Sequence, residues 1–134
     1  MTQLRIPKVL IADDEPHIRL LMKRTIKAMQ WQVVAEAKNG VEAVELFKEN
    51  SPDICLLDIS MPIKTGIEAL EEILAINPSA CVIMLTSMSD RESINQSMEL
   101  GAFHYIRKDT PLDEIKSILI EAWEEYQLEQ ERIP

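Results

Sequence analysis

The stretch that decides the fold is Pro52–Pro62, which reads PDICLLDISMP. Its apolar middle, residues 54–57, lies between two aspartates, Asp53 and Asp58. A short apolar run bounded by turn-forming residues predicts a buried strand. Ligands bind at the carboxyl ends of strands in open α/β sheets, and this strand ends at Asp58. A carboxylate there is costly to remove from water unless a positive group meets it. We therefore expect a cation, a lysine or a covalent modification at Asp58.

The length of 134 residues predicts a single domain, residues 1–134, with its core at about residues 8–126 and a polar tail or the start of a linker at 127–134. The net charge of -9 argues against direct nucleic-acid binding by this chain. No apolar run approaches the roughly 20 residues of a membrane span, and the N-terminus lacks the apolar segment of a signal peptide. We expect no membrane association, a cytoplasmic location and two reduced, buried cysteines, Cys55 and Cys81.

Short apolar runs alternate five times with segments of helical periodicity along the chain. The predicted strands are residues 8–12, 31–36, 54–58, 81–85 and 103–106. Strands that alternate with helices predict an α/β fold, a doubly wound parallel sheet of five strands covered on both faces.

Polar residues follow four of these strands: Asp13 and Asp14, Asp58, Thr86 with its neighbour Ser87, and Lys108. Taken singly, each has an ordinary explanation, such as an acidic pair that favours a helix start. Together they should meet at one edge of the sheet. Two carboxylates about 4 Å apart repel by about 4 kcal/mol at an effective dielectric constant near 20, and Mg²⁺ would remove that repulsion. A carboxylate beside the ion could then attack phosphorus and become an aspartyl phosphate.

These residues, with Gly66 and the run Leu-Leu-Asp-Ile-Ser-Met-Pro around Asp58, resemble the receiver (CheY-like) domain of response regulators in two-component signalling systems. The resemblance covers about residues 8–126. It implies a flavodoxin-like sheet in the order 2-1-3-4-5. It also implies a phospho-acceptor switch, in which a sensor histidine kinase or a phosphotransfer protein phosphorylates Asp58.

The resemblance also assigns roles to the other residues. It implies that Asp14, Asp58 and the backbone carbonyl of Ser60 bind Mg²⁺, with Asp13 acting mostly through water. Thr86 and Lys108 would hold the phosphoryl oxygens.

The resemblance further makes Tyr105 a switch residue that turns inward with Thr86. The face formed by the fourth helix, the fifth strand and the fifth helix would then change shape. That face would regulate a downstream effector or output domain, or form a phosphorylation-dependent homodimer. Met88, being apolar, would not orient water, which implies a long-lived phosphoryl group.

One departure from the family is that Asp109, and not proline, follows Lys108, so the isomer of that peptide bond stays open. A stand-alone receiver and a fragment of a larger regulator are both compatible with the sequence.

Two other functions remain as alternatives. An interaction module with this fold would not be phosphorylated. An aspartate-nucleophile phosphohydrolase would usually carry its nucleophile after the first strand and a second aspartate two residues later, a spacing that Asp13-Asp14-Glu15-Pro16 lacks. We therefore expect a regulatory phospho-acceptor and not an enzyme, one that at most catalyses its own phosphotransfer and dephosphorylation.

Overall fold

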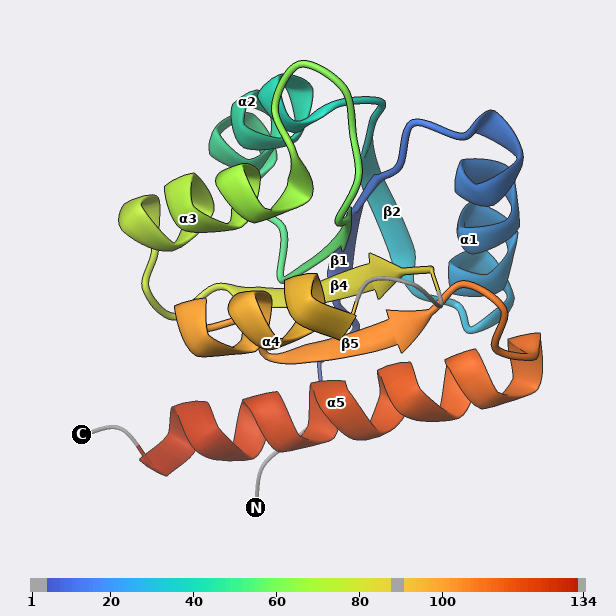
Figure 1. The fold of residues 1–134 in the computed structure, drawn as a ribbon. Coiled ribbons are helices and arrows are strands. Elements are labelled where there is room, and N and C mark those ends of the chain that lie inside the picture. Colours follow the sequence, from blue (N-terminus) through green and yellow to red (C-terminus); the bar gives the residue numbers. More distant parts are fainter. Residues whose placement is uncertain (1–4, 88–90, 133–134) are drawn as a thin grey trace.

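A computed structural model of the chain describes residues 5–87 and 91–132. Within these residues five strands alternate with five helices, as the sequence predicts, and each predicted strand lies within one residue of its expected bounds (Figure 1). The expectation for Met88 lies outside the described residues. The elements are β1 Lys8–Ala12, α1 Pro16–Ala28, β2 Gln32–Ala37, α2 Gly40–Asn50, β3 Ile54–Asp58, α3 Gly66–Ile76, β4 Cys81–Thr86, α4 Arg91–Leu100, β5 His104–Arg107 and α5 Leu112–Arg132.

The strands form one parallel sheet in the order β2-β1-β3-β4-β5, which confirms the predicted topology. Asp58 at the end of β3 lies beside Leu85 of β4, and Thr86 at the end of β4 lies beside Arg107 of β5. The carboxyl ends of the central strands therefore meet at one edge of the sheet.

Helices cover both faces of the sheet because side chains of the buried strands point alternately to either side. On one face α2, α3 and α4 pack through residues such as Phe47, Leu70 and Ile94. On the other face α1 and α5 pack through residues such as Ile26 and Leu119. Figure 1 shows α1 and α5 on the opposite side of the sheet from α2 and α3.

Both cysteines are reduced and buried, as predicted. Cys55 belongs to the core under α2 and α3, whereas Cys81 belongs to the core under α1 and α5. They therefore lie on opposite faces of the sheet and cannot be joined by a disulfide.

Helix α5 runs through Arg132, so the described part of the segment expected as a polar tail or the start of a linker continues the last helix. Gln127 is buried one turn after the buried Trp123, which continues the packed face of the helix. The Glu and Gln residues of this segment are also good helix formers. In the described residues, none of the helices combines the length and the apolar character needed to span a membrane.

Candidate functional site

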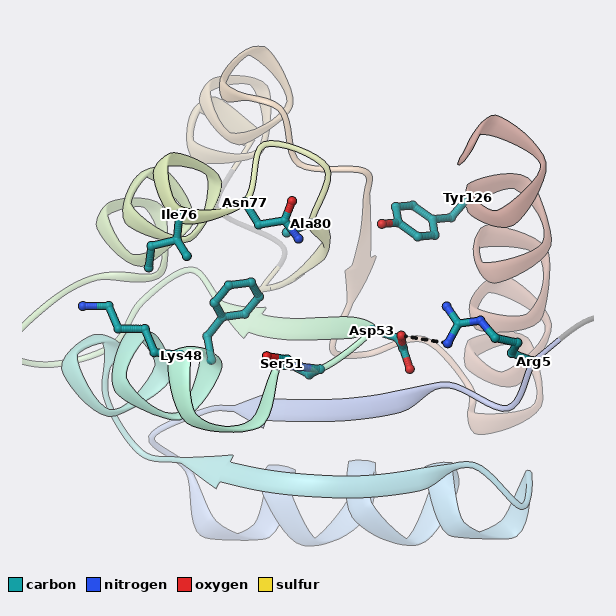
Figure 2. Close-up of a pocket in the computed structure, with 10 residues that line it drawn as sticks. Arg5, Lys48, Ser51, Asp53, Ile76, Asn77, Ala80 and Tyr126 are labelled. Atoms are coloured by element: carbon teal, nitrogen blue, oxygen red, sulfur yellow. Dashed lines mark ion pairs between the residues drawn. The ribbon is translucent and has the colours of Figure 1, made fainter. Parts of the chain in front are cut away.

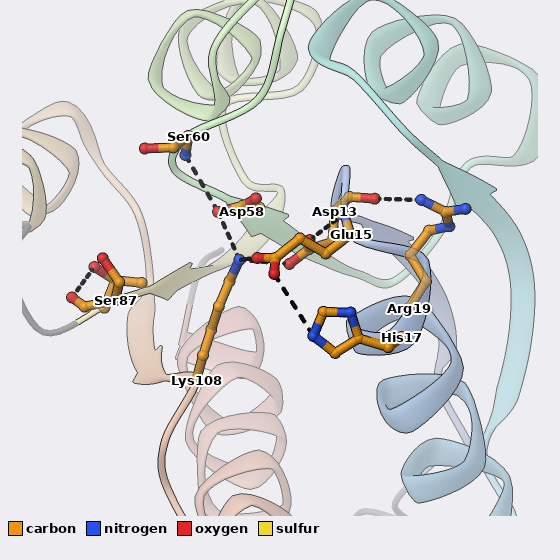
Figure 3. A network of polar contacts seen from close by, with 9 residues as sticks. Asp13, Glu15, His17, Arg19, Asp58, Ser60, Ser87 and Lys108 are labelled. Atoms are coloured by element: carbon orange, nitrogen blue, oxygen red, sulfur yellow. Dashed lines mark hydrogen bonds and ion pairs between the residues drawn. The ribbon is translucent and has the colours of Figure 1, made fainter.

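Residues at the carboxyl ends of β1, β3 and β5 meet at one edge of the sheet (Figure 3). Asp13 directly follows β1 and is fully buried, and Asp58, the last residue of β3, is almost fully buried. Lys108 follows β5, and its backbone N–H donates to the carbonyl oxygen of Thr86, 2.8 Å away, which fixes where the lysine leaves the sheet. The predicted convergence of two aspartates and a lysine is therefore present.

The ammonium group of Lys108 lies among three carboxylates. Its Nζ is 2.8 Å from Asp13 Oδ2, 3.1 Å from Asp58 Oδ1 and 3.1 Å from Glu15 Oε1. Burial alone would lower the pKa of Lys108, but Asp13, Asp58 and Glu15 outweigh that effect and raise it well above its usual value. The lysine is consequently a fixed positive charge at the centre of the site.

The two oxygens of Asp58 have different surroundings. Oδ1 accepts a hydrogen bond from the backbone N–H of Ser60 at 3.2 Å and pairs with Lys108. Oδ2 is buried and has no hydrogen-bond partner among the residues that the structure describes. Burial and the neighbouring Asp13 carboxylate raise the pKa of Asp58 to about 7, against the opposing effect of Lys108. One oxygen is therefore held in place, while the hydrogen-bonding capacity of the other is left unsatisfied.

A hollow of about 270 Å³ opens at this point and is lined by Asp14, Glu15, Asp58, Ser60, Ser87 and Lys108. Ligand oxygens of Asp13, Asp14, Glu15 and Asp58 all lie within 4.8 Å of one another. An all-oxygen set of this kind suits a hard divalent cation such as Mg²⁺. The unpartnered Oδ2 of Asp58 supplies an independent reason that the residues fit such an ion.

The loop from β3 to α3 is held against this site. An ideal Cβ on Gly66 would lie 2.0 Å from the carbonyl oxygen of Asp58, so only glycine fits there. The Lys64 N–H donates to the Pro62 carbonyl at 2.7 Å across Ile63, whose φ is 70°. A β-branched residue in that region is strained. Tight turns and close contacts therefore fix the segment that follows Asp58.

The two expected switch residues lie on β4 and β5. Thr86 is fully buried, and its hydroxyl donates to the Ser87 carbonyl at 3.0 Å. Tyr105 is 39% exposed and lines a hollow of about 310 Å³ together with Ile94 and Met98 of α4. The Lys108–Asp109 peptide bond, which the sequence left open, is trans, like the others in the described part of the chain.

The sequence reasoning gave no role in the site to Glu15, and it named Ser87 only as the neighbour of Thr86. The position of Glu15 directly after the acidic pair was a usable signal. Ser87 lines the hollow next to Asp58, whereas Thr86 is not among the lining residues. Adjacent residues at a strand end point in different directions, which residue spacing alone does not resolve.

A separate hollow of about 300 Å³ lies near the amino end of β3, far along the strand from Asp58 (Figure 2). Its lining includes the ion pair between Arg5 and Asp53, 3.3 Å apart. The Tyr126 hydroxyl donates to the Ser79 carbonyl at its edge. The acidic cluster lies at the opposite edge of the sheet, so this hollow is not part of the site described above.

Comparison with known proteins gives a consistent result. The family model "Response regulator receiver domain" matches residues 9–120. The chain is 41% identical over 115 residues to the chemotaxis protein CheY of Listeria monocytogenes, which covers 86% of this chain and 97% of that protein. It is 38% identical to CheY of Bacillus subtilis, over 81% of this chain and 90% of that protein.

Solved structures agree with the sequence relatives. The receiver domain of AraT, a response regulator from Geobacillus stearothermophilus, has a TM-score of 0.85 and 30% identity, and the match covers 94% of this chain and 99% of that domain. A response regulator receiver domain from Clostridium thermocellum has a TM-score of 0.82 and 31% identity, with 90% and 97% covered.

Proposed function

The chain belongs to the response regulator receiver domain family, and from that membership we propose that it is a phospho-acceptor switch whose Asp58 accepts a phosphoryl group from a histidine kinase or a phosphotransfer protein. Family membership supports a regulatory protein of two-component signalling. The proposal adds that Asp58 is the acceptor, that a histidine kinase or a phosphotransfer protein is the donor, that Mg²⁺ is the ion, and that the α4-β5-α5 face responds.

The observation that carries the proposal is the state of Asp58 Oδ2. This oxygen is buried and has no hydrogen-bond partner in the described part of the chain, whereas Oδ1 is held by Ser60 and Lys108. A buried, unpaired carboxylate oxygen is costly, so it is expected to have a ligand or a reaction. The adjacent hollow, which Asp58 helps to line, gives a donor a route toward this residue.

In the proposed step, Oδ2 of Asp58 forms a bond to phosphorus while the bond from phosphorus to the donor's imidazole nitrogen breaks. The nitrogen keeps the electron pair and takes up a proton. The Lys108 ammonium, already near Asp58, would neutralise a phosphoryl oxygen, and the Thr86 hydroxyl would bind another. Asp13, Asp14, Asp58 and the carbonyl of Ser60 would hold Mg²⁺, which supplies charge compensation for the phosphoryl group when bound.

The proposed response starts at Thr86, because its hydroxyl would have to leave the Ser87 carbonyl to reach a phosphoryl oxygen. Tyr105 lines the hollow against α4 and is partly exposed, so it has room to change its position. We propose that the α4-β5-α5 face thereby regulates an effector or output domain, or forms a homodimer. This is a local charge event that biases an element with two arrangements.

The test is intact mass after incubation with acetyl phosphate, with and without Mg²⁺. We expect one phosphoryl increment that requires Mg²⁺ and is lost in Asp58→Asn. Asp53→Asn is the matched control, because it removes the same charge from the other end of the same strand. An unlabelled parent chain, beside a control receiver that is labelled, would contradict the proposal and favour the unphosphorylated interaction module. Sustained turnover of a generic phosphate ester would instead favour a phosphohydrolase.

A further inference from the structure

Glu15 holds Lys108 in the resting protein. We propose that Glu15 is a positioning residue that occupies one N–H of Lys108 until a phosphoryl oxygen replaces it, and so slows phosphorylation of Asp58. This inference rests on the proposed function.

A structural role at the start of α1 does not account for the Glu15 side chain. Glu15 is the N-cap residue of α1, yet its side chain makes no capping hydrogen bond. Instead, Oε1 lies 3.1 Å from Lys108 Nζ, although the two residues are 93 positions apart in the chain. The carboxylate is thus directed toward the lysine and not toward the free N–H groups of its own helix.

The ammonium group has three N–H donors and, within residues 5–87 and 91–132, three carboxylate neighbours. An oxygen of an approaching phosphoryl group, while Asp58 is still a carboxylate, can therefore have an N–H of its own only if one existing contact is given up. The side chain of Asp13 is 0% exposed and that of Asp58 is 4% exposed, whereas that of Glu15 is 46% exposed. Leaving a buried carboxylate unpaired is costly, but water can replace the lysine at Glu15. Glu15 is consequently the contact that is exchanged.

Glu15 also has a second partner that remains after the exchange. Its Oε2 lies 3.6 Å from Nε2 of the exposed His17 (Figure 3). The carboxylate can therefore turn to solvent without losing every polar neighbour. The Asp13 side chain cannot turn to solvent in this way, because it is fully buried.

The exchange makes a kinetic prediction. If the ion pair between Glu15 and Lys108 exists only before phosphoryl transfer, neutralising Glu15 weakens it, which raises the phosphorylation rate and leaves the dephosphorylation rate unchanged. Partly exposed ion pairs are weak, so we expect phosphorylation by acetyl phosphate to be about two- to five-fold faster in Glu15→Gln. A residue that merely supported the fold would not separate the two rates in this way.

The experiment uses the full chain at saturating Mg²⁺ and follows intact mass during phosphorylation and after removal of the donor. Glu15→Asp keeps the charge but shortens the side chain by about 1.5 Å, one carbon–carbon bond, which removes the contact with Lys108. We expect it to be accelerated like Glu15→Gln. Glu36→Gln is the matched control, because Glu36 pairs with Lys23 at 3.1 Å outside the site, and we expect it to leave both rates unchanged.

Calorimetry of Mg²⁺ binding without any donor gives a second readout. We expect the dissociation constant to change by less than about threefold in Glu15→Gln, because a weak, partly exposed charge is lost but no ligand. A much larger loss of Mg²⁺ affinity would make Glu15 a ligand of the ion and overturn the proposal. Unchanged phosphorylation in Glu15→Gln, or a Glu15→Asp variant that behaves like the parent, would also overturn it. A parent chain that is never phosphorylated would instead overturn the proposed function, so the two failures are distinguishable.

Discussion

Replacing Asp58 with asparagine should stabilise the Mg²⁺-free protein at alkaline pH. Asp58 is almost fully buried and shares its surroundings with the buried Asp13, and Lys108 is the cation that contacts both. Burial and the charge of Asp13 raise the pKa of Asp58 from 3.8 to about 7. The ionised carboxylate is therefore less favourable in the folded protein than in the unfolded chain. Asparagine keeps the shape of the side chain and its acceptor for Ser60, but removes the charge.

The sign of the pH dependence follows from the raised pKa. The folded protein holds the Asp58 proton more tightly than the unfolded chain, so this group favours folding below pH about 4 and that contribution is lost as the pH rises through about 7. A rise of about three pKa units corresponds to about 4 kcal/mol of unfolding free energy. We expect Asp58→Asn to recover about half of this free energy, because the hollow admits water and the substitution removes one contact of Lys108. Asp58→Asn should thus gain little at about pH 4 and about 2 kcal/mol above about pH 7.

Urea unfolding with EDTA present, followed by far-ultraviolet circular dichroism across this pH range, measures the effect. Asp53→Asn is the control, because it removes the same charge from the other end of β3 and loses the ion pair with Arg5. We expect the control to show no gain in stability at any pH. A gain in Asp58→Asn that does not depend on pH, or a loss of stability above pH about 7, would refute the reasoning.

Three further predictions follow from the surroundings of the site. Gly66→Ala should lose about 2 kcal/mol or more in urea unfolding and slow the labelling of Asp58, since its Cβ would lie 2.0 Å from a backbone oxygen; a variant with parental stability would contradict the close contact. Thr65→Ala removes the capping box of α3 and should cost about 1 kcal/mol in the same assay while labelling remains. Cys55 and Cys81 should resist a maleimide in the native protein and react once it is unfolded, because burial raises the pKa of Cys81 to about 12 and that of Cys55 further; intact mass checks this, and rapid native labelling would argue against the burial.

Most of the fold was predictable because short apolar runs alternate clearly with segments of helical periodicity along the sequence. Apolar runs that are buried on both faces, such as residues 54–57 and 81–85, have few alternatives to a central parallel strand. Strand order then places Asp13, Asp58 and Lys108 at one edge. The length of α5 was not predictable in the same way, because the residues after 126 are mostly polar and give no apolar periodicity. The packed face of the helix nevertheless continues through the buried Gln127.

The finer structure of the site depends on directions of side chains that residue spacing does not give. Whether Thr86 or Ser87 faces the hollow depends on the orientation of the last residues of β4. The pairing of Glu15 with Lys108 joins residues 93 positions apart, and it arises only after β1 and β5 have taken their places in the sheet. Long-range contacts of this kind follow from the assembled fold and not from a local pattern.

The charges of the site explain why stability and reactivity are linked in this chain. Asp13 and Asp58 are buried around a single ammonium group, so the resting centre has a net negative charge that the fold must accommodate. A divalent cation would lower that cost, and by linkage it would stabilise the folded protein. Lys108 pairs with three carboxylates in the described residues, so moving its ammonium group closer to one of them weakens its ion pairs with the others. The arrangement that makes the metal-free site unfavourable is therefore the same one that leaves Oδ2 of Asp58 unpaired and Lys108 able to exchange Glu15 for another anion.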